Sequence, residues 1–558
     1  MNINRFKHKF SHLLIGCSIG LGLMSLPACE GVLDEDVISN IGNDYMNTPS
    51  GLKDGLNAAY STFRTFYGTE SGNNFTVFGT DTYTNGADGS WKFMNQYTSQ
   101  FDSRTGHVAN VWDNFYRGIN TCNAVIDRAP IVVGLDESTK AKYVAEAKFI
   151  RAHLYFLLTQ HFGGVDLQLT ETIIPSTDVT RSTVPQMYQA IISDLESAIP
   201  DLEATMKSTD YGRATRPAAE HLMGWVYLTK GYSEASESTD FANAETYFEA
   251  VIDGYGFQLL PDFADVYAFG NEINDEVIFS VQYTRDPLTN GGGNNTHLYF
   301  LMEYDIQPGM QRDVENGRPW KRFRPTNYTL NEAFVNRDID SRYQKSFKDV
   351  FYSNTPGAYN TTFDLSKTSL NFALGDTTIY IPGYEISEAE RAKKPYQILT
   401  PSMYTDKLYP TLTKHLDPGR LDKTQAAGGR DYIVFRLADT YLLLAEAQFQ
   451  QNKLSEATET INMVRRRAAW PGAEASMEIA ASDLSLTFIM DERARELLGE
   501  QKRWMDLVRW GTLVERVKLY NTQGAPNIKD THVLRPIPQN QIDRIPGGKD
   551  AFPQNPGY

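Results

Sequence analysis

The chain has few cysteines and few histidines. Only Cys17, Cys29 and Cys122 occur among 558 residues, and nine histidines are spread along the sequence. Two of the cysteines lie within the first 29 residues, which leaves no disulfide for the body of the protein. The scattered histidines argue against a dedicated metal centre. Stability must therefore come from a packed core, which a hydrophobic content of 41% can supply at this length.

Motifs of familiar catalytic sites are also missing. The sequence has no His-Glu-x-x-His, no Gly-x-Ser-x-Gly and no phosphate-binding loop, and Gly547-Gly548-Lys549 lacks the upstream glycine of a nucleotide loop. We expect no cofactor. No loop has EF-hand spacing, so no motif supports a structural calcium ion, although one bound by loop carbonyls and an Asp stays open as an alternative. A glycosidase needs only two carboxylates, and 69 acidic residues keep a surface hydrolase open as an alternative.

The N-terminus has the features of a bacterial lipoprotein signal peptide. Three basic residues precede an apolar run from Leu13 to Leu26, which is too short to span a membrane, and Leu26-Pro27-Ala28-Cys29 follows it. We expect residues 1–28 to be removed, Cys29 to be lipidated and residues 29–48 to form an acylated tether. Removing three of the 53 basic residues leaves 50 against 69 acidic ones, a net charge near −19, which argues against a nucleic-acid partner.

Residues 49–270 carry the repeating apolar pattern of amphipathic helices. The stretches end at Gly, Pro or Asn, as helices commonly do. Short turns between successive helices indicate stacked helical hairpins with a period close to that of tetratricopeptide units. The predicted helices lie at 49–66, 106–128, 137–162, 183–204, 214–231 and 240–253.

The pattern changes after residue 270. Residues 271–430 have short strand-like runs, such as 276–283, between Gly-rich turns and polar loops, and are predicted to form a large loop-rich insertion with few short strands. Helices are predicted again at 431–451, 455–468 and 484–512, so that residues 431–558 supply C-terminal helices and a tail that pack on the repeats. The predicted fold class is mainly α, with tetratricopeptide-like stacked hairpins interrupted by an irregular insertion.

A series of motifs spread over nearly the whole mature chain resembles the SusD/RagB family of outer-membrane nutrient-binding lipoproteins. Gln501 departs from the family pattern, which usually has Gly after Glu500, and this puts the local packing there in doubt. The most specific motifs, in chain order, are Trp112-x-x-Phe-Tyr-Arg-Gly-Ile-Asn120, Phe435-Arg-Leu-Ala-Asp-Thr-Tyr-Leu-Leu-Leu-Ala-Glu-Ala447, Arg503-Trp-Met-Asp-Leu-Val-Arg-Trp-Gly511 and Gln554-Asn-Pro-Gly-Tyr558.

The resemblance implies a SusD-like fold and a function at the cell surface. A lipid-anchored protein of the outer membrane would capture oligosaccharides and pass them to a SusC-like TonB-dependent transporter, without acting as an enzyme. Within the same family, the alternative is a RagB-like receptor that captures peptides. Two further alternatives are a surface glycoside hydrolase and a purely structural lid on the transporter.

Sugar recognition requires flat aromatic faces beside amides and charged groups. The loop 81–97 and the 271–430 insertion both offer aromatics without an amphipathic period that would bury them. We predict that Trp91 and Trp320 are the stacking platforms, although each could instead anchor its loop to the scaffold. The secondary faces are predicted to be Tyr83 and Tyr299, and the hydrogen-bond partners Asp81, Asn85 and Arg318.

Several charged residues stand among apolar helix positions. Burial of such groups is costly unless they are paired, so we predict that they join helix to helix through charge-assisted hydrogen bonds and do not contact ligand. They are Arg151, Glu446, Arg465, Arg493, Glu500 and Arg503.

Overall fold

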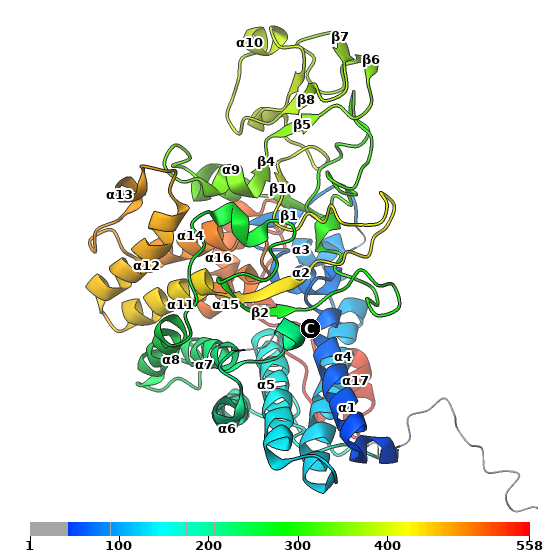
Figure 1. Ribbon diagram of the computed structural model, residues 1–558, viewed down its shortest axis with the longest axis vertical. Coiled ribbons are helices and arrows are strands. Elements are labelled where there is room, and N and C mark those ends of the chain that lie inside the picture. The colour runs from blue at the N-terminus through cyan, green and yellow to red at the C-terminus, as the bar shows by residue number, and fades with distance from the viewer. Residues whose placement is uncertain (1–42, 90, 175, 206–207) are drawn as a thin grey trace, which may run out of the picture. The chain divides into compact units, whose positions relative to one another are not determined.

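Helices dominate the N-terminal part of the chain (Figure 1). The computed structural model describes residues 43–89, 91–174, 176–205 and 208–558, so the predicted signal peptide, Cys29 and most of the predicted tether lie outside the described residues. The helices of this part are α1 (Pro49–Ser61), α2 (Glu70–Thr76), α3 (Lys92–Gln96), α4 (Gly106–Arg128), α5 (Glu137–Phe162), α6 (Val184–Ala198), α7 (Arg216–Lys230) and α8 (Asp240–Gly254).

Side-chain caps fix where several of these helices begin. The Asp136 carboxylate accepts the Thr139 N–H at the start of α5, and Thr183 forms a capping box with Gln186 at the start of α6. The helix α5 ends at Gly163, whose φ of 73° lies in the left-handed region that favours glycine. The Asp136 cap and Gly163 explain why the predicted bounds of α5 agree with the structure, and the predicted bounds of α4 agree as well.

Neighbouring helices pack as antiparallel pairs. The helices α4 and α5, α5 and α6, and α7 and α8 lie against one another, and α11 (Leu437–Gln450) pairs with α12 (Leu454–Ala468). Because α11 also packs on α8, the C-terminal helices extend the stack (Figure 1). The predicted mainly α fold of stacked hairpins is confirmed.

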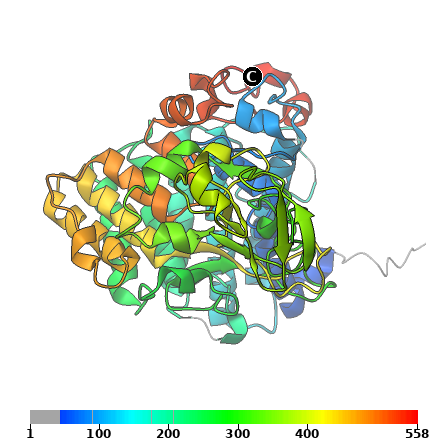
Figure 2. The same cartoon turned by 90° about the horizontal axis from the view of Figure 1, so that it is seen from above.

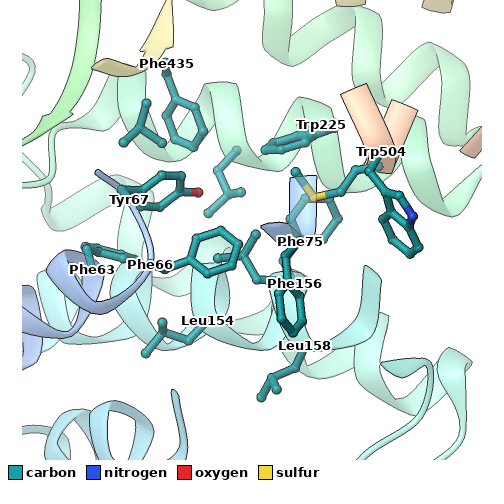
Figure 3. Packing of buried hydrophobic residues seen from close by; sticks show 14 of the residues in the cluster. Phe63, Phe66, Tyr67, Phe75, Leu154, Phe156, Leu158, Trp225, Phe435 and Trp504 are labelled. Atoms are coloured by element: carbon teal, nitrogen blue, oxygen red, sulfur yellow. The ribbon is translucent and has the colours of Figure 1, made fainter. Parts of the chain in front are cut away.

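Aromatic side chains fill the interior between these pairs. Phe66, Phe75 and Phe156 are fully buried together with Trp225 and Trp504, and they come from both ends of the chain (Figure 3). Such residues contribute most of the apolar area removed from water on folding. The core therefore joins the N-terminal and C-terminal helices into one body.

The middle of the chain forms short strands. Figure 1 shows the strands β5 to β8 and the helix α10 at one end of the helical body, and Figure 2 views the molecule from that end. The strands pair as β1 with β3, β2 with β11, β4 with β10, β6 with β7, and β8 with both β5 and β9. Their bounds are β1 (Tyr83–Asn85), β2 (Val277–Val281), β3 (Phe323–Pro325), β4 (Phe347–Lys348), β5 (Val350–Tyr352), β6 (Gly357–Asn360), β7 (Ser369–Phe372), β8 (Thr377–Tyr380), β9 (Gln397–Ile398), β10 (Thr411–Leu412) and β11 (Tyr432–Arg436), with α9 (Arg342–Ser346) and α10 (Glu388–Ala392) between them.

Two predicted C-terminal helices differ from the structure. The first six residues of the predicted helix 431–451 include β11, because its β-branched and aromatic side chains pair with β2. The predicted helix 484–512 is interrupted between α14 (Leu486–Glu496) and α15 (Arg503–Arg509), where Gly499 and Gln501 have φ angles of 77° and 57°. Gln501 thus occupies a conformation that favours glycine. The remaining helices are α13 (Glu474–Met477), α16 (Leu513–Tyr520) and α17 (Gln539–Asp543).

The six charged residues predicted to be paired are all in ion pairs. Four of the pairs join two helices, as predicted, whereas Glu500 binds Arg436 of β11 and Arg503 binds Asp81 ahead of β1. The pairs are Arg151–Asp194 (2.7 Å), Glu446–Arg509 (2.9 Å), Arg465–Glu492 (2.6 Å), Arg493–Asp506 (3.0 Å), Glu500–Arg436 (2.8 Å) and Arg503–Asp81 (2.6 Å).

Candidate functional site

The short ladder between β1 and β3 brings the two predicted ligand segments together. The strands run antiparallel, with Thr84 opposite Arg324 and Asn85 opposite Phe323. The contact continues beyond the ladder, where the Gly86 N–H donates to the carbonyl oxygen of Arg322 at 2.8 Å. The loop 81–97 therefore lies against residues 320–325 of the insertion, although 237 positions separate Asn85 from Arg322.

Arg322 lies at the centre of a polar and aromatic group that we call the Arg322 cluster, made of Glu70, Trp91, His107, Trp320 and Arg322. The Arg322 Nε is 3.2 Å from the Glu70 carboxylate, and its guanidinium lies 5.2 Å from the centre of the Trp320 ring. Burial, and to a smaller extent Arg322, lowers the pKa of His107, on which Trp91 packs. Trp320 thus adjoins Arg322 itself and Trp91 adjoins its neighbour His107, and both indoles are partly exposed.

Trp91 precedes α3 and packs on the first turn of α4. Its ring centre is 3.7 Å from that of His107 and 5.7 Å from that of Phe93. The His107 Nδ1 is hydrogen-bonded to the Ser71 hydroxyl at 2.8 Å, and its buried Nε2 has no partner among the described residues. Burial, with a smaller contribution from Arg322, lowers the pKa of His107 to about 4. The imidazole is therefore neutral at pH 7 and supports the indole as an uncharged aromatic surface.

Trp320 is held by Arg318 and Tyr299 in addition to Arg322. The Arg318 guanidinium lies 5.8 Å from its ring centre and donates a hydrogen bond to the Thr424 carbonyl oxygen at 2.7 Å. Tyr299 packs against the indole with ring centres 5.9 Å apart. Lys321, with a φ of 46°, turns the chain between Trp320 and Arg322. Two guanidinium groups beside one indole favour a fixed ring orientation through cation–π attraction.

Four of the predicted ligand contacts are buried, and as direct contacts they are wrong for this conformation. Tyr83 and Asp81 are 0% exposed, and Asn85 and Tyr299 are each 2% exposed. Asp81 is instead bound by Arg503 and Arg516 at 2.6 and 2.8 Å. Burial opposes the charge on Asp81, but the two guanidinium groups outweigh it and hold its pKa below the usual value.

Tyr83, Asn85 and Tyr299 are part of the buried packing beneath the partly exposed tryptophans. Tyr83 packs on Phe300 with ring centres 5.0 Å apart, Asn85 belongs to the β1–β3 ladder, and Tyr299 lies against Trp320. The predicted loop contains a strand that faces the interior, and that burial follows from pairing with a segment far along the chain. Of the predicted ligand residues, Trp91, Trp320 and Arg318 retain exposed surface.

Glu70, His107 and the central position of Arg322 were missed by the sequence reasoning. Arg322 stands two residues after Trp320, within the segment of the insertion that the sequence favours, but it was not chosen as a ligand contact. His107 follows the glycine that begins a predicted helix, and Glu70 begins the short helix α2. Neither has a local signal of its role, because the contact with Arg322 forms only when β1 pairs with β3.

The arrangement offers recognition chemistry. Two partly exposed indoles present apolar faces, while Arg318, Arg322 and Glu70 supply charged hydrogen-bonding groups beside them, as a sugar or another polar ring requires. Within residues 43–558, outside the gaps, no group of three or more His, Cys, Asp or Glu side chains could hold a metal ion. In the same part of the chain, no helix is long and apolar enough to cross a membrane.

Comparison with known families and proteins gives consistent matches. The model of the SusD family matches residues 275–558, and a second model, described as starch-binding and associating with the outer membrane, matches residues 33–228. SusD-like protein P25 of Formosa agariphila is 24% identical over 96% of this chain and 98% of its own length. The starch-binding protein SusD of Bacteroides thetaiotaomicron is 24% identical over 76% of this chain and 74% of its own length.

Solved structures show the same fold. A laminarin-binding SusD-like protein has a TM-score of 0.64 at 22% identity and covers 92% of this chain and 100% of its own. Surface glycan-binding protein A from Bacteroides thetaiotaomicron, in complex with laminarihexaose, has a TM-score of 0.64 at 20% identity, with 91% and 99% covered. At these identities the likeness extends to the arrangement of the helices and strands.

Proposed function

The chain belongs to the SusD family, and from this membership we propose that it is a lipid-anchored, cell-surface protein that binds glycans without cleaving them. The observation that supports this best is the Arg322 cluster, in which the partly exposed Trp320 lies against Arg322 and the partly exposed Trp91 packs on the nearby His107. Relatives with the same fold include a laminarin-binding protein and one in complex with laminarihexaose. We propose Trp91 and Trp320 as the stacking platforms and Arg318 as a polar partner.

The proposed stacking contributes a measurable part of the affinity. A tryptophan face that covers roughly 70 Å² of a sugar's apolar edge contributes about 2 kcal/mol at about 25 cal/mol per Å². Losing that contact corresponds to about a 30-fold rise in Kd. Because His107 is neutral and Trp320 is flanked by guanidinium groups, we expect the two platforms to differ in their preference for charged sugars.

Transfer to a transporter is the second part of the proposal. Lipidation at Cys29 and the tether to residue 48 would keep the protein near a SusC-like TonB-dependent barrel at high effective concentration. Ligand shared between the two proteins would stabilise the closed complex by its extra affinity there. We expect the protein to co-purify with such a barrel from outer membranes, and the Cys29→Ala variant to leave the membrane fraction. Recovery of both forms in the soluble fraction would contradict the anchor.

Affinity electrophoresis tests glycan binding and its location. Native gels would contain laminarin, starch, agarose, carrageenan, polygalacturonate or methyl-esterified pectin, and a bound polysaccharide slows migration. We expect at least one of them to retard the wild-type protein, and Trp91→Ala and Trp320→Ala each to restore migration substantially. Tyr384→Ala is the control, because Tyr384 is 58% exposed and lies in the insertion outside the cluster. Equal retardation of all four proteins would reject the proposed platforms.

Two alternative functions give different results in the same experiments. A hydrolase would release new reducing ends from the retained polysaccharide during incubation, whereas a binding protein would leave it intact. A peptide receptor would be retarded by none of the polysaccharides and would bind members of a peptide library. Either result would replace glycan capture as the proposed function.

A further inference from the structure

A cavity lies beside β3, at the end away from the Arg322 cluster. It has a volume of about 260 Å³, enough for a single sugar-sized group, and its walls include Arg324, Tyr404, Tyr409 and Tyr520. Asn327 and Thr522, which also line it, are exposed at its rim. The cavity thus combines one cation with three aromatic rings.

Arg324 has no hydrogen bond and no ion pair with any described residue, although it is mostly buried and its Nε is inaccessible to solvent. Its closest electrostatic neighbours are the exposed Asp406 and the hydroxyl of Tyr409, and burial outweighs both, so that the pKa of Arg324 is lowered. The Tyr409 hydroxyl donates to the Leu301 carbonyl oxygen at 3.0 Å. Burial of a guanidinium without a partner is costly, and an anion in the cavity would remove that cost.

The neighbouring arginines do not share this condition. Arg322 pairs with Glu70, Arg318 donates to Thr424, and Arg516 pairs with Asp81 and Asp491. The wall threonine Thr84 is also committed, since its hydroxyl donates to Asn521 at 2.8 Å. The Nη N–H donors of Arg324 therefore stay free of the described residues and can meet a group that enters from outside.

We propose that the Arg324 cavity is an anion subsite that binds the carboxylate or sulfate group of an acidic glycan. A guanidinium binds either group through two parallel hydrogen bonds, and the tyrosine rings supply faces for the attached sugar. The identification of the ligand as a glycan rests on the proposed function, whereas the anion subsite itself does not.

The position of the cavity fits a ligand that also reaches the Arg322 cluster. Arg322 and Arg324 are two residues apart along an extended segment, so they project from the same side about 7 Å apart, while Phe323 faces the core. Tyr409 also borders the loop that leads to Trp91, since its hydroxyl lies 3.3 Å from the position of a β-carbon on Gly86. In a chain with a net charge of −16, an acidic ligand needs such a local cation.

Titration calorimetry with small anions tests the subsite alone. Sodium glucuronate and sodium sulfate would be titrated into the wild-type protein at constant ionic strength, which removes general screening effects. We expect saturable binding of at least one of them, weakened tenfold or more in Arg324→Gln and partly kept in Arg324→Lys, which retains the charge without the two-pronged geometry. Arg104→Gln is the matched control, because Arg104 is an exposed arginine. No saturable binding, or equal binding by Arg324→Gln, would overturn the subsite.

Paired polysaccharide gels then identify the anion and separate the two proposals. Polygalacturonate against methyl-esterified pectin tests the carboxylate, and carrageenan against agarose tests the sulfate. We expect Arg324→Gln to lose the preference for the charged member of one pair. Retention of neutral polysaccharides alone would refute the acidic ligand and leave glycan binding intact. Anion binding at Arg324 without retention of any polysaccharide would refute the proposed function and leave the subsite intact.

Discussion

The ion pair between Arg503 and Asp81 offers a quantitative test of how the site is supported. The Asp81 carboxylate is 0% exposed and accepts from Arg503 Nε at 2.8 Å, from Arg503 Nη2 at 2.6 Å and from Arg516 Nε at 2.8 Å. Arg503→Met removes two of these three charge-assisted bonds. Breaking a buried pair costs about 3–5 kcal/mol, and the remaining Arg516 places the expected loss near the lower end, at about 3 kcal/mol.

The loss of unfolding free energy in Arg503→Met should depend on pH in a defined direction. In the wild type, the pKa of Asp81 is below its unfolded value, so the stability it contributes is present above that value and falls as pH drops through the folded pKa. In Arg503→Met, only Arg516 remains to offset the effect of burial, so the pKa of Asp81 shifts upward. The cost of burying the ionised Asp81 carboxylate is then largest at neutral pH. The difference in stability between the two proteins should therefore narrow from pH 7.5 to pH 4.5.

Urea unfolding at both pH values measures this effect. Arg466→Met is the control, because Arg466 pairs with a Glu459 carboxylate that is 65% exposed, and such a pair contributes about 1 kcal/mol or less. The double variant Arg503→Met/Asp81→Asn should lose about 2 kcal/mol less unfolding free energy than the sum of the losses in the two single variants. Glycan retention by the folded variant should be unchanged. A loss as small as that of the control, or one independent of pH, would refute the reasoning.

Three further substitutions test other parts of the structure. Gly89→Ala places a β-carbon 3.0 Å from Arg322 Nη1 at a residue with a φ of 113°, so polysaccharide retention should fall severalfold. Unchanged retention would show that the loop around Gly89 does not take part in binding. Asp431→Asn removes a carboxyl whose pKa burial raises to about 6, so ionisation of Asp431 lowers the stability of the wild type as pH rises through 6. The variant should therefore have a higher urea midpoint than the wild type at pH 7.5 and the same midpoint at pH 4. Equal midpoints of the two proteins at both pH values would contradict this. Glu496→Gln weakens a 0% exposed carboxylate bound by Arg436, Arg467 and Arg342 and should cost about 3 kcal/mol in thermal unfolding, whereas a cost under about 1 kcal/mol would contradict that network.

The predictable part of the fold was the part set by local signals. The bounds of α4 and α5 agree with the sequence pattern, and for α5 the Asp136 cap and Gly163 mark where the helix begins and ends. The helix predicted over 484–512 failed because a short left-handed interruption at Gly499 and Gln501 leaves the apolar period almost unchanged. The apolar periodicity of a sequence cannot reveal a helix break of that kind.

The candidate site was predictable only in part, for a related reason. Trp91 and Trp320 could be named as large aromatics in polar segments, and the structure brings both to the neighbourhood of Arg322. Asp81 and Tyr83 stand in an equally polar segment, and their burial depends on Arg503 and on β3, which lie hundreds of residues away. Exposure of a loop side chain is decided by such long-range pairing and has no local signature.

Retention of the Trp91→Ala/Trp320→Ala double variant in a gel containing the polysaccharide that retards the wild type is the most direct test of glycan capture by the Arg322 cluster. Migration equal to that in a gel without polysaccharide is expected, with Tyr384→Ala still retarded. Retardation of the folded double variant to the wild-type extent would contradict it.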